Sequence, residues 1–270
     1  MAPDISVIIP TYQRPQLLVH ALDSALGQQG AAIEIIVVDD CPDHSAAQVI
    51  AAYSGQNVRY IANTKPSGGH PAIVRNLGWS QATGRYLHFL DDDDIVPEGH
   101  YERVLAAFSR APKVGTVVGR IKPFGDDLGA LAPEETYFIL AERRASQLRW
   151  LGDWIGFSSW LLCKSTFLVC SSAVVSRDCV SRIGGFNTEM EINEDVDFLC
   201  RAIRCAGAIK LHETAIYYRI HSSLMHGGPD KHIKFVRSYR LMQDRYALEH
   251  GKLELLALKI LASLVEKLPC

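Results

Sequence analysis

Short apolar runs alternate with helical patterns in the N-terminal half of the chain. Residues 5–10, 33–38 and 58–62 are apolar, rich in β-branched side chains and too short for helices, which is typical of buried strands. Apolar residues recur at helical spacing after Pro15 and again within residues 46–53. Strands that alternate with helices predict parallel pairing, so we expect a layered α/β sheet with a Rossmann-like N-terminal half.

The pattern continues through the rest of the chain. Pro71 is placed to begin a helix that carries Ile73, Val74 and Leu77 inward, and residues 85–90 form another apolar run typical of a buried strand. Further strands are expected at residues 114–121 and 170–175 and in a segment that ends within residues 216–223. Further helices are expected after Pro97, after Glu191, at residues 231–246 and at residues 252–268.

Four consecutive carboxylates, Asp91 to Asp94, follow the apolar run at residues 85–90. Adjacent like charges repel and lose hydration on folding, so their retention at a strand end favours a bound cation. Aspartate runs also form solvated turns, and from the run alone that alternative is equally supported. The position favours a ligand site, because ligands bind at the carboxyl edge of open α/β sheets. We interpret this acid run as a site for a divalent metal and a diphosphate.

Composition narrows the class of protein. With 270 residues, of which 48% are hydrophobic, the chain can bury a full core. A net charge of −2 argues against general nucleic-acid binding, which needs an excess of Lys and Arg. Seven cysteines without a CxxC pair indicate reduced thiols, and the N-terminus lacks a signal-sequence pattern, so we expect a cytoplasmic protein.

Five motifs together resemble the family 2 glycosyltransferases of the GT-A fold. They are Ser-Val-Ile-Ile-Pro-Thr-Tyr at 6–12, Glu-Ile-Ile-Val-Val-Asp-Asp at 34–40, Arg-Asn-Leu-Gly at 75–78, Ala-Thr-Gly-Arg-Tyr at 82–86 and Leu-Asp-Asp-Asp-Asp at 90–94. The resemblance extends from about residue 6 to about residue 223. It implies an inverting enzyme that moves a sugar from a nucleotide-diphospho-sugar, expected to be UDP-linked, to a hydroxyl of a glycan or lipid-linked acceptor.

The resemblance also implies a domain organisation. A GT-A domain is expected at residues 1–228, with a nucleotide-sugar-binding half at 1–121 and an acceptor-side half at 122–228. Its sheet should be mixed but mostly parallel and flanked by helices. Residues 229–270 are expected to form a C-terminal helical extension.

On the nucleotide side, the resemblance places Pro10, Thr11 and Tyr12 at the border of the nucleobase. Asp39 is implied as the acceptor of a hydrogen bond from the uracil ring, and Arg14 joins the nucleotide-sugar-binding set. Gly68-Gly69, ahead of the helix at Pro71, is a weak candidate for an anion-binding turn.

The resemblance assigns the acid run to the ribose and the metal. Asp93 is the expected direct ligand of Mg²⁺ or Mn²⁺, whereas Asp91 and Asp92 contact the ribose or sugar in a register that the extra carboxylates leave open. Arg75 is implied to bind the nucleotide-sugar, although a generic surface arginine is equally supported by the residues alone. A hard cation is needed because the departing diphosphate gains negative charge.

A second acidic segment, Glu-Asp-Val-Asp at residues 194–197, matches the acceptor-side motif of the family. The resemblance implies that Asp195 is the general base, because a carboxylate must remove the proton of the attacking hydroxyl. Without the resemblance, the helix dipole is the favoured explanation of acidic residues at a helix start, and catalysis is the weaker one. Glu194 is expected to support the base or bind the acceptor, and Asp197 is the alternative base if the register shifts.

The Tyr-Arg-Ile-His segment at residues 218–221 resembles a family segment that closes over the diphosphate. Arg219 is then a phosphate clamp and His221 a ligand of the metal or of phosphate, with His226 as the alternative. A structural histidine is an equally supported interpretation of His221.

Residues 122–168 carry no recognisable motif. The apolar stretch 150–168 is too interrupted to span a bilayer. We expect core packing there, with an aromatic acceptor platform formed by Trp154 and Trp160 as the alternative. In the family that the chain resembles, the processive synthases usually carry a Gln-x-x-Arg-Trp motif. The chain lacks this motif, which favours addition of a single sugar.

The helix expected at residues 252–268 has a broad apolar face that must be covered. Packing on its own domain, a homodimer and a peripheral contact with the inner face of a membrane are the three alternatives. Only two or three positive charges border the face, so electrostatic attraction to anionic lipid is expected to be slight.

Two other functions compete with sugar transfer. A nucleotidyltransferase would need a glycine-rich phosphate loop after the first strand, and residues 10–14 supply no glycine. A catalytically inactive module that binds sugar-nucleotide or glycan would have lost the metal ligand or the base, yet Asp93 and Asp195 are both present.

Overall fold

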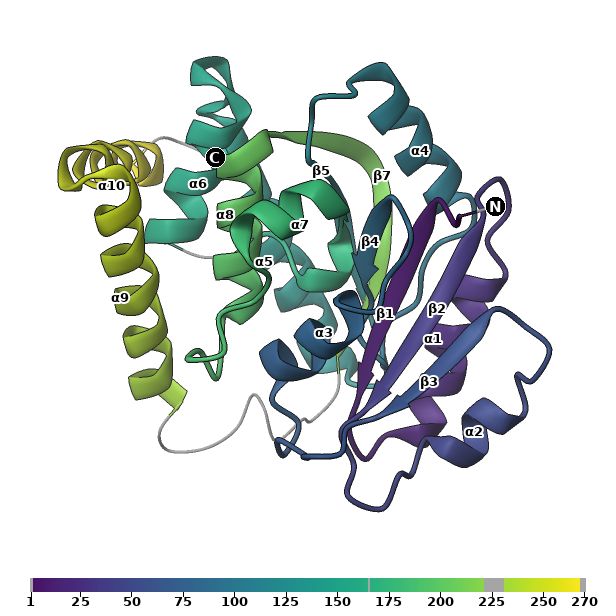
Figure 1. Cartoon of the computed structure of the whole chain (residues 1–270). Helices are drawn as coiled ribbons and strands as arrows, with labels where there is room; N and C mark the ends of the chain where they lie inside the picture. The colour runs from purple at the N-terminus through teal and green to yellow at the C-terminus, as the bar shows by residue number, and fades with distance from the viewer. Residues whose placement is uncertain (1, 165, 221–230, 268–270) are drawn as a thin grey trace.

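The computed structural model describes residues 2–164, 166–220 and 231–267, which form one seven-stranded sheet with helices on both faces (Figure 1). The strand order is β3-β2-β1-β4-β6-β5-β7. The strands are β1 (Ile5–Thr11), β2 (Ile33–Asp39), β3 (Val58–Ala62), β4 (Tyr86–Phe89), β5 (Thr116–Phe124), β6 (Ala173–Ser176) and β7 (Ala208–Arg219). β6 runs antiparallel to both neighbours, whereas the other neighbouring strands pair in parallel. The predicted mixed, mostly parallel sheet is confirmed.

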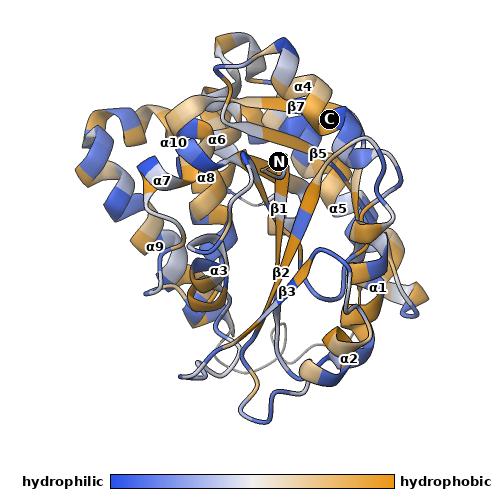
Figure 2. Cartoon of the chain, turned by 45° about the vertical axis from the view of Figure 1, so that its right-hand side comes forward, coloured by the Kyte–Doolittle hydropathy of each residue, from blue (hydrophilic) through white to orange (hydrophobic). Residues whose placement is uncertain are grey.

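The helices divide between the two faces of the sheet. They are α1 (Pro15–Leu26), α2 (Ala47–Ala51), α3 (Pro71–Trp79), α4 (His100–Arg110), α5 (Leu128–Ser146), α6 (Asp153–Cys163), α7 (Arg177–Ile183), α8 (Glu194–Ala206), α9 (Lys231–His250) and α10 (Lys252–Glu266). In Figure 2, β2 and β3 pass between α3 on one side and α1 and α2 on the other.

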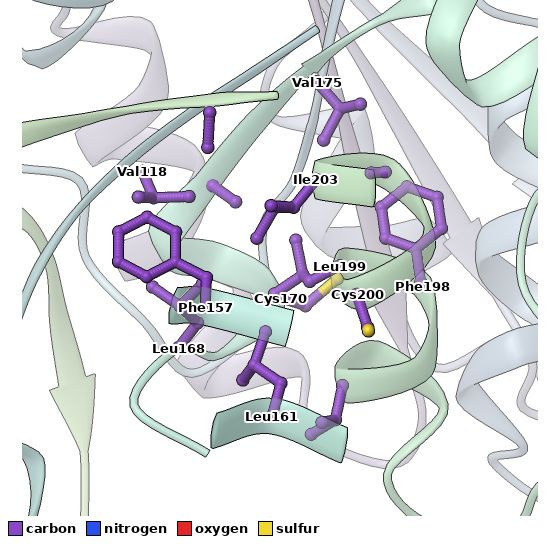
Figure 3. Packing of buried hydrophobic residues seen from close by; sticks show 14 of the residues in the cluster. Val118, Phe157, Leu161, Leu168, Cys170, Val175, Phe198, Leu199, Cys200 and Ile203 are labelled. Atoms are coloured by element: carbon purple, nitrogen blue, oxygen red, sulfur yellow. The ribbon is translucent and has the colours of Figure 1, made fainter. Parts of the chain in front are cut away.

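The core follows from the two-residue period of the strands. In β1, Ile8 packs in one buried cluster with Ile36 and Val38, whereas Val7 and Ile9 belong to a second cluster on the opposite face. The first cluster is covered mainly by α3, α6 and α8, and the second by α1 and α4. Figure 3 shows part of the first cluster, to which α6 contributes Phe157 and Leu161 and α8 contributes Phe198 and Leu199.

The orientation of α3 corrects one prediction. Leu77 was expected to point inward but is 38% exposed, and Gly78 faces the sheet instead. A Cβ atom at Gly78 would lie 2.4 Å from Cγ2 of Ile8, so α3 can come this close to β1 only because Gly78 has no side chain. This close approach turns Leu77 to the surface and carries Arg75, next to Val74, into the interior.

Two further segments differ from expectation. Residues 170–172 form a 3₁₀ turn (Cys170–Ser172), so β6 begins only at Ala173. The segment after β6 forms α7, which the sequence pattern did not predict.

The C-terminal helices pack on the rest of the fold. Leu255 and Leu258 of α10 are buried in the same cluster as Met242 and Tyr246 of α9 and Trp160 of α6. The predicted packing of the last helix on its own domain is therefore confirmed for one of its faces. The predicted boundary at residue 228 lies outside the described residues. Within the described part of the chain, no helix is both long enough and apolar enough to cross a bilayer.

Candidate active site

The acid run lies at the carboxyl edge of the sheet and is tied to the loop after β1. The hydroxyl of Thr11 donates to Oδ2 of Asp92 at 2.7 Å. Nη1 of Arg14 lies 2.6 Å from Oδ2 of Asp93 and 3.5 Å from Oδ1 of Asp92. The structure therefore brings together the predicted residues Thr11, Arg14, Asp92 and Asp93.

Burial makes this cluster costly without a cation. Burial and the neighbouring charge of Asp93 raise the pKa of Asp92 to about 7, and the same two causes raise the pKa of Asp94 well above its usual range. Oδ2 of Asp94 is buried, and no hydrogen-bond partner for it is found among the described residues. An unpartnered carboxylate oxygen beside other carboxylates fits a hard divalent cation.

The described residues do not by themselves form a complete metal site. No group of three His, Cys, Asp or Glu side chains among them is arranged to hold an ion. This agrees with the way Mg²⁺ is usually held, by one or two carboxylates together with the phosphates of a substrate. A metal here would therefore depend on the diphosphate that it accompanies.

The end of β7 closes one side of the acid run. The amide of Arg219 donates to Oδ1 of Asp94 at 3.0 Å, and Nε of Arg219 donates to the carbonyl oxygen of Asp93 at 2.8 Å. The guanidinium also stacks over Phe124, with Cζ 4.4 Å from the ring centroid. Arg219 is thus held beside the acid run, whereas His221 and His226 lie outside the described residues.

Arg75 joins the acid run to the second acidic segment. Its Nη2 donates to Oδ1 of Asp91 and its Nη1 to Oε1 of Glu194, both at 2.7 Å. The side chain is 4% exposed and lies over the ring of Phe186, so the surface interpretation of Arg75 is wrong. The bridge places the start of α8, with its candidate base Asp195, next to the acid run.

Asp195 has the electrostatic environment of a proton acceptor. Burial, followed by the neighbouring charge of Glu194, raises the pKa of Asp195 to about 7, although Arg75 acts in the opposite direction. The alternative base, Asp197, is 3% exposed and forms an ion pair with Arg201 at 2.7 Å. Asp197 is therefore held in a structural ion pair, so Asp195 is better placed to act as the general base.

The two aspartates at the end of β2 organise neighbouring loops. Asp39 is fully buried and accepts hydrogen bonds from the amides of Cys41 at 2.9 Å and Ala46 at 3.0 Å and from the hydroxyl of Tyr60 at 2.9 Å. Because its carboxylate already has these three donors, its first role in the structure is to shape the loop after β2.

Asp40 has a role that the sequence did not suggest. Its carboxylate accepts hydrogen bonds from the amides of Ser67 at 2.9 Å and Gly69 at 2.6 Å and from the side chain of Asn63 at 2.6 Å. The Gly68-Gly69 turn, which we considered as an anion site, thus binds a carboxylate of its own chain. Tyr12 packs against this turn, since a Cβ at Gly69 would lie 2.9 Å from Cδ1 of Tyr12.

Two further residues, Ser171 and His88, hold the acid run in place from below and were not predicted from the sequence. The hydroxyl of Ser171 accepts a hydrogen bond from the amide of Asp91 at 3.0 Å, and the carbonyl of Ser171 lies 2.9 Å from Nε2 of His88. Both residues are fully buried. Neither carries a sequence signal, because Ser171 falls within an expected strand and His88 within an apolar run.

The aromatic acceptor platform is not supported. Trp160 is 4% exposed and belongs to the core, and Trp154 is half-buried with Cζ of Arg204 4.3 Å from its ring centroid. Core packing, the other prediction for this stretch, is the one that the structure confirms.

Comparisons with known proteins identify sequence relatives of this chain and solved structures of the same fold. The succinoglycan biosynthesis protein ExoO of Rhizobium meliloti is 27% identical over 218 residues, which cover 80% of this chain and 60% of that protein. The minor teichoic acid biosynthesis protein GgaB of Bacillus subtilis is 38% identical over 108 residues, 39% of this chain and 12% of that protein. The chain thus spans 60% or less of the length of these two relatives.

Solved structures share the fold. S. aureus TarS in complex with UDP-GlcNAc matches with a TM-score of 0.66 and 17% identity, over 97% of this chain and 71% of that chain. The mannosyltransferase PcManGT of Pyrobaculum calidifontis, in complex with GDP-Man and Mn²⁺, matches with a TM-score of 0.63 and 18% identity, over 100% of this chain and 77% of that one.

The family model named Glycosyl transferase family 2 matches residues 6–183, a span that contains β2 to β6, all of β1 except Ile5, and the acid run. This chain therefore belongs to glycosyl transferase family 2.

Proposed function

We propose that this chain transfers a sugar from a nucleotide-diphospho-sugar, with UDP as the nucleotide, to a hydroxyl of a glycan or lipid-linked acceptor. The observation that carries the proposal is the Arg75 bridge between Asp91 and Glu194. A donor held at the acid run would lie beside Asp195, whose raised pKa suits a proton acceptor. TarS and PcManGT were solved with nucleotide-sugars, which supports a donor of this class.

Asp93 is the side chain that we assign to a divalent metal, Mn²⁺ or Mg²⁺. The unpartnered Oδ2 of Asp94 and the crowding of carboxylates beside it support the assignment. The metal would neutralise the charge that collects on the departing diphosphate. Asp91 and Asp92 contact the ribose or sugar in this proposal, and Arg14 exchanges its contact with Asp93 for a phosphate oxygen.

The nucleobase would lie between the loop after β1 and the end of β2. Pro10, Thr11 and Tyr12 line this position in the proposal. That Asp39 accepts a hydrogen bond from uracil stays a prediction, and a base would have to share the Asp39 carboxylate with the three donors that it now holds.

In the proposed step, Asp195 takes the proton of the acceptor hydroxyl as that oxygen forms a bond to the anomeric carbon. The bond from the anomeric carbon to the diphosphate oxygen breaks at the same time. A single direct displacement inverts the anomeric centre and needs no covalent sugar intermediate. Glu194, fixed through Arg75, holds the start of α8 in place, and Arg219 lies where it can meet the diphosphate.

The names of the relatives suggest the setting. ExoO and GgaB are named for the biosynthesis of succinoglycan and of minor teichoic acid. We therefore place this chain in the assembly of cell-surface polysaccharide, on the cytoplasmic side of the membrane.

Release of nucleoside diphosphate tests the proposal. The chain is incubated with UDP-, GDP-, dTDP- and CDP-sugars, with Mn²⁺ or with a chelator, and water serves as a slow acceptor. We expect release from one class of donor only with metal, and a loss of about 100-fold or more in Asp195→Asn. Asp178→Asn, an exposed aspartate of α7, is the matched control and should leave the rate unchanged.

Other outcomes point to the alternatives. Binding of nucleotide without any release of diphosphate by the wild type would favour an inactive binding module. Formation of pyrophosphate from a nucleoside triphosphate and a sugar 1-phosphate, without release of nucleoside diphosphate from the sugar donors, would favour a nucleotidyltransferase.

A further inference from the structure

The last helix, α10, has two apolar faces. The inner face packs on the domain and consists of Leu255, Leu258, Ala262 and Val265. The opposite face carries four residues that we call the outer stripe, Leu253, Leu256, Ile260 and Leu264. Their exposed fractions are 83%, 53%, 52% and 56%, so nothing in the described part of the chain covers them.

The outer stripe lies at the margin of the molecule. α10 forms an outer edge of the fold in Figure 1, where it packs through its inner face on α6 and α9. A helix of 15 residues is about 22 Å long. The stripe thus forms an apolar ridge along most of the helix.

Three exposed lysines border the stripe. Lys252 and Lys259 each lie one helical turn from Leu256, and Lys267 lies one turn beyond Leu264; all three lysines are exposed. The ridge therefore combines large aliphatic side chains with a cationic border.

The carboxylates of α10 do not offset these lysines, because each is paired within the domain. Glu254 accepts a hydrogen bond from Nε of Arg204 at 3.2 Å, and Glu266 forms an ion pair with Lys164 at 2.5 Å. Both partners come from other elements of the fold, so these negative charges are already balanced.

We infer that the outer stripe docks on an anionic lipid surface. An amphipathic helix that lies in the membrane interface presents Leu-type side chains to the acyl boundary and lysines to lipid phosphates. The stripe offers four such side chains along one ridge, with lysines at its border. Apolar burial supplies most of the binding, and the few lysines set the preference for anionic lipid. This inference does not depend on the proposed sugar transfer.

A second copy of this chain fits the same face less well. In a symmetric antiparallel pair of α10 helices, the flank of one copy faces the same flank of the other. When the two helices overlap along their whole length, Lys259 meets Lys259 of the second copy, and Lys252 lies opposite Glu266, which is already paired with Lys164. Like charges in contact oppose association, whereas lipid phosphates complement them.

Vesicle sedimentation with the full chain tests the inference. The probes are vesicles of phosphatidylcholine alone and vesicles that also contain phosphatidylglycerol, at low and high salt. We expect sedimentation with the anionic vesicles, weaker at high salt and weaker with phosphatidylcholine alone. The double variant Leu256→Gln/Ile260→Gln should lower the partition coefficient at least about tenfold, because two large aliphatic side chains are lost from the lipid contact.

Controls separate docking from misfolding. Leu128→Gln changes an exposed leucine at the start of α5, 79% exposed, and should bind like the wild type. Lys252→Glu/Lys259→Glu should lose the preference for phosphatidylglycerol. The outer-stripe variants should unfold at the wild-type temperature, because the mutated side chains are exposed in the fold.

Three results would overturn the inference. The wild type could stay in the supernatant with anionic vesicles, or the Leu256→Gln/Ile260→Gln variant could sediment as the wild type does. Light scattering without lipid could also show a dimer that the same variant dissociates, which would assign the outer stripe to a second copy.

Discussion

Arg75 holds the candidate site together at the scale of single residues. Its two donors reach carboxylates that lie far apart in the sequence, Asp91 and Glu194. Removing one member of a buried ion-paired group leaves the others uncompensated, which costs about 3–5 kcal/mol.

Arg75→Gln should therefore lower the free energy of unfolding by about 3 kcal/mol and remove most of the activity. Urea unfolding and nucleoside diphosphate release measure the two effects. Arg182→Gln is the control, because Arg182 forms an exposed pair with Asp178 on α7 and should cost about 0.5 kcal/mol or less. An Arg75→Gln variant as stable as the wild type would show that the bridge is not a structural link.

The pKa of Asp195 predicts a pH dependence. The base must be ionised, so kcat/KM should fall about tenfold per unit below a pH near the Asp195 pKa of about 7. Glu194→Gln removes the neighbouring negative charge that raises this pKa, so the falling limb should move to lower pH. The same substitution at Glu191, an exposed residue, should leave the limb in place. A limb that does not move in Glu194→Gln would mean that another group titrates.

At the scale of elements, Gly78 fixes how α3 sits on β1. Alanine is normally the better helix residue, by about 1 kcal/mol. At this position a Cβ would lie 2.4 Å from Ile8 and 3.1 Å from Val38, so Gly78→Ala should destabilise the chain by about 1–3 kcal/mol. Leu77→Ala, in the neighbouring exposed position, should cost less than about 1 kcal/mol. Urea unfolding of both variants checks the order, and a stabilising Gly78→Ala would contradict the packing of α3.

The elements that the sequence predicted well are those that carry a short, mostly apolar run rich in β-branched residues. β1, β2 and β3 all begin at the expected residues, and β1 and β2 are buried over most of their length. The edge strand β3 is only half-buried and carries the exposed Arg59. The inner face of α3 was misjudged because its closest contact is a glycine, which carries no apolar signal. The turn at residues 170–172 was read as a strand because its residues are as buried as those of β6.

The candidate site divides in the same way. The acid run could be found because four like charges at a strand end are unusual and local. Its supports could not, because the contacts of Arg75 with Glu194 and of Asp91 with Ser171 join segments far apart in the chain. The hydrogen bond from the amide of Gly69 to Asp40 is another contact between distant segments, so it could not be predicted from the sequence either.

At the scale of the whole molecule, buried histidines make the folded chain less stable at acidic pH. His100 is 2% exposed, and neither ring nitrogen has a hydrogen-bond partner among the described residues. Burial, with His88 and Arg103 nearby, lowers the pKa of His100 to about 3. Below about pH 6.5, His100 therefore binds a proton in the unfolded chain but not in the folded chain. The contribution of His100 to stability is complete above that pH and decreases as the pH falls towards 3.

His100→Phe should remove this acid penalty. The substitution should raise the free energy of unfolding by about 2 kcal/mol more at pH 5 than at pH 8. The reason is that the wild type loses stability over the roughly 1.5 pH units below pH 6.5, where His100 is protonated only in the unfolded chain, and the variant does not. Urea unfolding at the two pH values measures the difference. His212→Phe changes an exposed histidine of β7 and should show no such pH-dependent gain. Equal gains at both pH values in His100→Phe would show that His100 does not titrate with folding.

We expect the acid run to bind a metal together with a nucleotide. Thermal unfolding of the purified chain is measured with UDP, GDP, dTDP or CDP, each with and without Mn²⁺. Asp93→Ala is the variant and Asp178→Ala is the control. A ligand that binds only the folded state stabilises it by about 2.7 kcal/mol at 100 times its Kd. UDP should raise the melting temperature only with Mn²⁺, Asp93→Ala should lose this shift and Asp178→Ala should keep it. No shift with any nucleotide, or an equal shift in Asp93→Ala, would show that the acid run is not a site for metal and nucleotide.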